Sequence, residues 1–164
     1  MITGSATKGF RILQIFMRFL WNYFFQLSIF SKKVNDQHNL PNVNILKAQI
    51  ELFKEMCMKA PATPEQGRDI DFILITGELF TLAVYGQLIL ENAEIYGESD
   101  DLIEQIFDCL IRDFSLFATK LYSKPVTNEK QMEYCLKMIK KPVDDVERFE
   151  RMLKIVYSHE DIYP

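Results

Sequence analysis

Residues 69–97 read DIDFILITGELFTLAVYGQLILENAEIYG, and this stretch decides the fold class. It is nearly all apolar between Phe72 and Leu90, and Gly97 can adopt the left-handed conformation that commonly closes a helix. Upstream, residues 63–66 (TPEQ) have the arrangement of a capping box, with an N-cap hydroxyl, a proline at the first helical position and a glutamine three residues on. The sequence therefore predicts a long helix that starts at this box, ends at Gly97 and lies buried at the centre of the fold.

Further helices are expected on both sides of this one. Asn44 can cap a helix that runs to about Lys59, where Pro61 follows. Its apolar residues are spaced close to three or four apart, as on a buried face: Ile45, Leu46, Ile50, Phe53 and Cys57. Ser99 or Asp100 can cap the next helix, whose apolar face follows the same spacing: Ile103, Phe107, Leu110, Phe114, Phe117 and Leu121.

Two shorter helices complete the chain. Residues 123–125 (SKP) end the preceding helix, Thr127 or Asn128 caps one that runs through Lys140, and Pro142 opens the last. We expect that last helix to turn four residues inward, namely Val146, Phe149, Leu153 and Val156. The predicted fold is all-α, a helical bundle of about five to six helices with no sheet.

Residues 10–31, FRILQIFMRFLWNYFFQLSIFS, form an aromatic-rich segment that is long enough to span a bilayer. Its polar residues fall on one helical stripe, and two arginines within a span would be costly: Arg11, Gln14, Arg18, Asn22 and Gln26. A buried helix of a soluble domain, an interfacial membrane helix and a true span all stay open. Residues 32–44 are polar and interrupted by Pro41, so we divide the chain into 1–43, this amphipathic helix with its linker, and 44–164, the helical bundle domain.

Composition narrows the functional classes. With 164 residues the chain fits a single domain, and its net charge of −4 with scattered basic residues disfavours nucleic-acid binding. The cysteines Cys57, Cys109 and Cys135 are odd in number and embedded in apolar helical patterns, which favours free thiols in the cytoplasm or another reducing compartment. Contact with a membrane surface through residues 10–31 is the alternative location.

No residue pattern predicts a catalytic or metal site. The only histidines, His38 and His159, lie in the polar linker and the tail, without ligands at helical spacing. Ser115 and Thr119 have no histidine within helical reach, and the glycines are too scattered for a phosphate loop.

Several charged residues are better explained by structure than by chemistry. Glu78 lies among apolar neighbours, so we expect it to pair with Arg68 or Arg112. Glu91 and Glu94 should form a solvated face, and Gly77 and Gly86 should allow close packing.

The sequence also suggests two charged surface features and one candidate cavity. Asp108 can pair with Arg112 four residues on, and Lys137, Lys140 and Lys141 form a small solvated basic cluster. A small-ligand pocket between helices is the least favoured alternative, and aromatic residues would line it: Phe72, Phe80, Tyr85, Phe107 and Phe114.

The region from about Leu46 to Tyr157 resembles the C-terminal helical region of acyl-CoA dehydrogenase-like flavoproteins, especially the very-long-chain type. The resemblance rests on LKAQIELFKEM (46–56), on residues 69–97 with Gly77-Glu78-Leu79-Phe80 followed by Leu82-Ala83-Val84-Tyr85, and on DLIEQIFDCLIRDFSLFATKLY (101–122). These are helix-packing patterns, and none of the family's catalytic or flavin-contacting residues can be transferred.

The resemblance implies an appended domain or fragment of an enzyme of fatty acyl-CoA oxidation, contributing to assembly or membrane-surface attachment without a complete active site. FAD would belong to the parent enzyme, and none is expected on this chain alone. The implied partners are the flavin-binding part of that enzyme or a homo-oligomer. The alternative is a free-standing helical interaction or membrane-surface module with no enzyme parent.

Overall fold

The computed structural model describes residues 40–158, and every regular element in that range is helical. The elements are α2 (Pro41–Lys59), the short 3-10 helix η1 (Gln66–Arg68), α3 (Ile70–Tyr96), α4 (Asp100–Tyr122), α5 (Glu129–Met138) and α6 (Val146–Ser158). The predicted all-α bundle is therefore confirmed. Residues 10–31 and both histidines lie outside the described residues.

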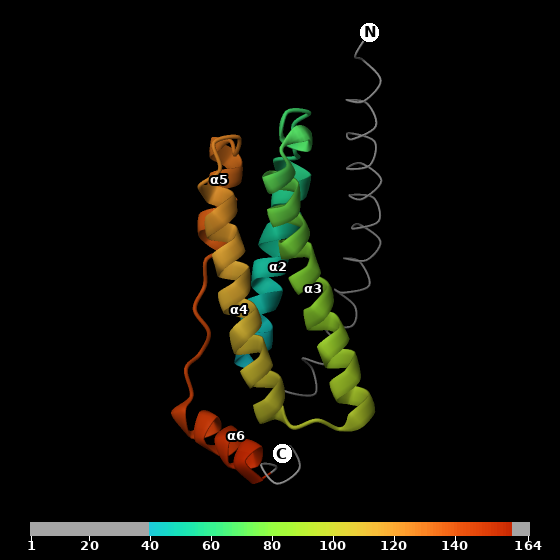
Figure 1. Cartoon of the computed structure of the whole chain (residues 1–164), viewed down its shortest axis with the longest axis vertical. Helices are drawn as coiled ribbons and strands as arrows, with labels where there is room; N and C mark the ends of the chain where they lie inside the picture. Colours follow the sequence, from blue (N-terminus) through green and yellow to red (C-terminus); the bar gives the residue numbers. More distant parts are fainter. Residues whose placement is uncertain (1–39, 159–164) are drawn as a thin grey trace.

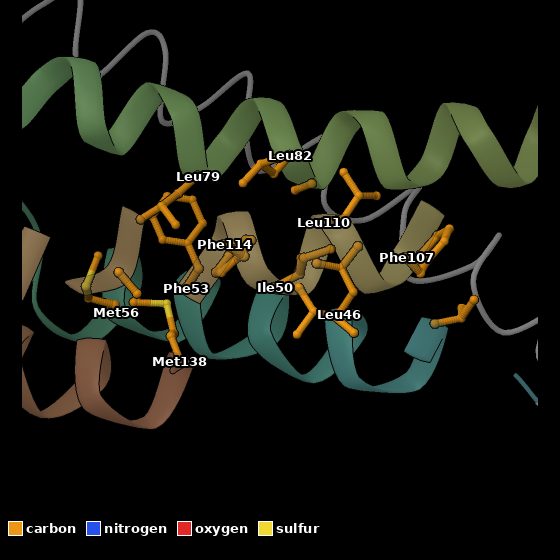
Figure 2. Close-up of a cluster of buried hydrophobic side chains, with 14 of the residues drawn as sticks. Leu46, Ile50, Phe53, Met56, Leu79, Leu82, Phe107, Leu110, Phe114 and Met138 are labelled. Carbon is orange, nitrogen blue, oxygen red and sulfur yellow. The ribbon is translucent and has the colours of Figure 1, made fainter. Parts of the chain in front are cut away.

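Helices α2, α3, α4 and α5 lie side by side and alternate in direction, and α4 is the helix that the other three surround (Figure 1). It packs against α2, α3 and α5 along its length, and α6 lies across the lower end of the bundle, where it touches α4. Figure 2 shows the core between α2, α3 and α4, in which Phe53 and Phe114 meet edge to face with ring centroids 6.2 Å apart. Both rings are completely buried, and Leu79 of α3 closes over them.

The helix predicted to be central has only one face in this core. The buried face of α3 includes Leu79, Ala83 and Leu90, whereas Leu74 and Tyr85 on its opposite side are exposed. Apolarity all round α3 suggested full burial, but within the described part of the chain α3 is covered mainly by α4, with smaller contacts from η1 and α2. The prediction of a central, buried helix at this position is wrong, and α4 takes that place.

The start of α3 also differs from the prediction. The capping box does form, because the Thr63 amide donates to Gln66 Oε1 (2.9 Å) and the Gln66 amide donates to Thr63 Oγ1 (3.3 Å). The box closes the turn at residues 64–65 that leads into η1, and α3 begins only after Asp69, whose side chain accepts from the Phe72 amide. Gly97 closes α3 with a φ of 68°, as predicted.

The other helix bounds follow the sequence more closely. Asn128 caps α5 with a complete capping box, although the helix ends at Met138 rather than at Lys140. The predicted face of α4 is buried except for Phe117, which is half-buried. An N-cap at Asn44 would make Ile45 the first helical residue, but the helix starts four residues earlier, at Pro41.

Candidate interaction surface

The acidic side chains singled out in the sequence do not form a reactive site. Glu78 is exposed, and it pairs with neither predicted arginine. Arg112 binds Asp108 instead, with Nε 2.6 Å from Oδ1, as its spacing predicts. The apolar neighbours of Glu78 misled the prediction because several of them lie on the exposed side of α3 themselves.

The remaining carboxylates and lysines are surface groups. Glu94 is exposed, and Glu91 is half-buried and accepts from Gln87 Nε2 at 2.6 Å. The three lysines of the predicted basic cluster are all exposed: Lys137, Lys140 and Lys141. Within residues 40–158, no group of three or more histidine, cysteine or acidic side chains could hold a metal ion.

The hydroxyl groups of α4 serve the fold. Ser115 Oγ donates to the Lys140 carbonyl (2.8 Å) and accepts from the Lys140 amide (2.9 Å) and from Gln49 Nε2 (3.0 Å). Gln49 also donates to the Met138 carbonyl at 2.8 Å, so its amide joins α2 to α4 and α5. Thr119 Oγ1 donates to the carbonyl of Ser115. Each hydroxyl is thus held by a structural hydrogen bond.

The cysteines differ from one another in environment. Cys135 is completely buried, and burial raises the pKa of its thiol to about 12, which makes it a poor nucleophile. Cys109 is exposed on the outer side of α4, although its apolar neighbours in sequence suggested an apolar setting.

The aromatic residues of the hypothetical ligand pocket do not face one another. Phe107 and Phe114 are core residues of α4, whereas Tyr85 is 54% exposed on the far side of α3. Gly86 packs closely against Leu46 of α2, since a Cβ at position 86 would come within 2.9 Å of Leu46 Cδ2. Gly77 has open space around it, so the packing role predicted for both glycines holds for Gly86 alone.

The most tightly built polar cluster in the described part of the chain centres on Glu104. This glutamate belongs to α4 and is only 5% exposed. Its carboxylate accepts from the amide of Asn42, at 3.0 Å to Oε1 and 3.2 Å to Oε2. Because Leu40 has no side chain that can cap α2, Glu104 caps the helix from 62 residues away. This contact explains why α2 starts at Pro41.

Arg148 of α6 completes the cluster. Its guanidinium nitrogen Nη1 lies 3.4 Å from Glu104 Oε2, and both side chains are only 6% exposed. Burial raises the pKa of Glu104, and the amide hydrogen bonds at the start of α2 and the charge of Arg148 oppose that rise. Glu104 and Arg148 therefore depend on each other, because either charge buried without the other would cost free energy of folding.

A second ion pair holds α6 in the same orientation. Arg151 Nε and Nη2 donate to the two carboxylate oxygens of Asp101, at 2.6 and 2.8 Å. Asp101 lies in the first turn of α4, where a helix favours negative charge. The side of α6 that carries Arg148 and Arg151 is consequently the side that faces the bundle.

The apolar side of α6 points the other way. Val146 is 71% exposed, Phe149 51%, Val156 62% and Tyr157 64%. An amphipathic helix normally buries its apolar stripe and leaves arginines in water, so α6 is docked in the reverse sense. Of the four residues predicted to point inward, Leu153 is half-buried and the other three are exposed, so the prediction is wrong for Val146, Phe149 and Val156. The two ion pairs turn the basic side of the helix toward α4 instead.

A second apolar surface runs along α3. Ile70–Tyr96 is long and apolar enough to cross a membrane by length and composition, and 44% of its most apolar stretch is buried against the rest of the protein. A core helix of a soluble protein passes the same test, so this property alone is weak support for a membrane span.

Comparison with protein-family models, with curated proteins and with solved structures finds no significant match to this chain. The resemblance to acyl-CoA dehydrogenases therefore stays a prediction.

Proposed function

We propose that this chain is a helical assembly domain that associates with a second copy of itself through the outward apolar face of α6. The observation that supports this is the reversed docking of α6, in which Arg148 is buried and Phe149 is 51% exposed. A helix so held by its basic side keeps its apolar side available for another surface.

The charges beside that face suit an antiparallel pair of α6 helices. Glu150 and Lys154 are exposed and lie on the same edge of the apolar stripe, one in each half of the helix. When two copies pair about a two-fold axis near Met152, Glu150 of one copy comes beside Lys154 of the other. Each contact then occurs twice, and both bring opposite charges together.

The pairing surface is small. A helix of 13 residues is about 20 Å long, which is short for a stable interface on its own. We therefore expect a weak, concentration-dependent dimer, which a parent assembly or a longer contact would strengthen.

Sedimentation equilibrium over a range of concentrations tests this proposal. Phe149→Lys should weaken association by about tenfold or more, because it places a charge at the centre of the apolar contact. Leu136→Lys is the matched control, since Leu136 is 55% exposed but lies on α5. A chain that stays monomeric at all concentrations, or equal effects of both substitutions, would contradict the proposal.

The sequence resemblance favours a more specific context, in which the assembly domain is appended to an acyl-CoA dehydrogenase-like flavoenzyme of fatty acyl-CoA oxidation. The supporting observation is the order and pattern of the segments 46–56, 69–97 and 101–122. In this proposal the FAD and the catalytic base reside on another part of the enzyme. The purified chain should then show no flavin absorbance, and stoichiometric FAD with acyl-CoA turnover would overturn this context.

A further inference from the structure

Asn42, in the first turn of α2, belongs to a closed ring of hydrogen bonds. Its side-chain Nδ2 donates to the Glu104 carbonyl at 3.3 Å, in addition to the bond from its backbone amide to the Glu104 carboxylate. Its Oδ1 accepts from the Val143 amide at 2.8 Å. The Val143 carbonyl accepts from Arg148 Nη2 at 3.3 Å, and Arg148 Nη1 returns to Glu104 Oε2. We call these four residues the Asn42 ring.

The ring joins segments that are far apart in the sequence. Asn42 is completely buried in α2, and Val143 lies in residues 139–145, a linker without regular structure that leads from α5 to α6. Of the described helices, α6 packs against α4 and not against α2. The ring therefore ties the docking of α6 to the first turn of a helix that α6 does not touch.

Arg148 is the weakest member of the ring. Its two contacts within the ring are long, at 3.3 and 3.4 Å. Its Nε is buried and has no hydrogen-bond partner among the described residues. A buried donor without a partner costs free energy, and water reaches that donor when α6 moves away. The ring consequently opens most readily at α6.

Opening at one position weakens the other contacts of the ring. When Arg148 leaves, the Glu104 carboxylate stays behind as a buried charge without a cation, which favours its turning toward water and away from α2. When Asn42 no longer holds the Val143 amide, the Val143 carbonyl is no longer fixed in place for Arg148. Buried hydrogen bonds that share members in this way support one another.

We propose that the first turn of α2, the linker 139–145 and α6 open and close together as one latch, so that α6 presents its outer apolar face only while the start of α2 is in place. The effect on association rests on the proposed function. A released α6 has 13 residues, which is too short for a stable isolated helix, so its apolar stripe no longer forms a surface. The coupling is reciprocal, and pairing of α6 with a second copy steadies the first turn of α2.

Hydrogen exchange of single amides detects the latch directly. The amides of Asn42 and Val43 bond to Glu104 and have no acceptor within α2, so their exchange reports on the ring. Asn42→Ala should speed exchange in α6 by at least tenfold and weaken association several-fold in sedimentation equilibrium. Arg148→Met should in turn speed exchange of the Asn42 and Val43 amides, and it leaves α2 itself unaltered.

Gln131→Ala is the matched control. Gln131 is 1% exposed and donates to the Ala60 carbonyl at 3.0 Å, but it lies where α5 begins, at the end of the bundle opposite α6 (Figure 1). Its loss should lower the global stability in urea while changing α6 exchange and association less than threefold. Far-UV circular dichroism checks that each variant keeps its helices.

A double variant tests whether the ring acts as a unit. Asn42→Ala combined with Arg148→Met should speed α6 exchange by clearly less than the product of the two single effects. Raising the wild-type concentration through the dimer range should slow exchange of the Asn42 and Val43 amides. Multiplicative effects, or an Asn42→Ala variant that behaves like Gln131→Ala, would overturn the latch. A wild-type chain that stays monomeric would overturn the proposed function instead, and the exchange results would decide the latch alone.

Discussion

Replacing Arg148 by methionine should release α6 from the bundle. The substitution keeps most of the apolar stem of the side chain but leaves the Glu104 carboxylate buried without its cation. At the observed separation of 3.4 Å, the Coulomb attraction is about 5 kcal/mol at an effective dielectric constant of about 20. Loss of one partner from a buried pair costs about 3–5 kcal/mol.

The chain can avoid most of this cost by undocking α6, because water then reaches Glu104. The free-energy change should therefore appear as local opening of α6 and not as global unfolding. A loss of about 3 kcal/mol corresponds to roughly 150-fold faster amide exchange in α6. Amides in the middle of α4 should change far less, because that helix stays enclosed by α2, α3 and α5.

Native-state hydrogen exchange of the two helices measures both effects in one experiment. Arg148→Met combined with Glu104→Gln is the control, since the neutral amide oxygen can still accept from the Asn42 amide and no buried charge remains. That double variant should recover much of the protection of α6. Exchange in α6 of Arg148→Met within threefold of wild type would refute the view that this ion pair holds the helix.

Three other outcomes follow from named contacts. Gly86→Ala should destabilise the protein by about 1–3 kcal/mol in urea unfolding, because its Cβ would come within 2.9 Å of a leucine methyl, whereas Gly77→Ala should stabilise it by up to about 1 kcal/mol. The hydrogen bond from Arg151 of α6 lowers the pKa of Asp101 below its ordinary value of 3.8, so the stability that this ion pair adds to the docked α6 is present above pH 3.8. That stability is lost as the pH falls through the lower pKa of the folded protein. The difference in α6 exchange between wild type and Asp101→Asn should therefore vanish on acidification. In a timed alkylation read by mass spectrometry, Cys109 should react well before Cys135, and equal rates would contradict the burial of the latter.

Local signals in the sequence predicted local features of this fold. The capping residues at Ser99 and Asn128, the closing glycine at position 97 and the apolar face of α4 all depend on neighbours within a few residues, and all are present in the structure. The start of α2 depends on a carboxylate 62 residues away, so no inspection of residues 40–44 could locate it.

The candidate interaction surface was missed for a related reason. Periodicity predicts that α6 is amphipathic, and it is, but periodicity cannot tell which of the two sides faces the bundle. That choice is made by Glu104 and Asp101, which lie on α4. Arginines three residues apart on α6, together with acidic residues at the start of α4, were the signal available in the sequence. That signal identifies the side of α6 that faces the bundle only when α6 is known to lie beside the start of α4, and only the tertiary structure shows this.

The claim that α6 pairs with a second copy is tested most directly by mixing two charge variants. Glu150→Lys alone and Lys154→Glu alone each bring like charges together at both contacts of an antiparallel pair, so each should self-associate more weakly than wild type at low salt. An equimolar mixture places lysines opposite glutamates at both contacts. Sedimentation equilibrium of that mixture should show a dimer at least as tight as that of wild type. A mixture that associates no better than the separate variants would contradict the account.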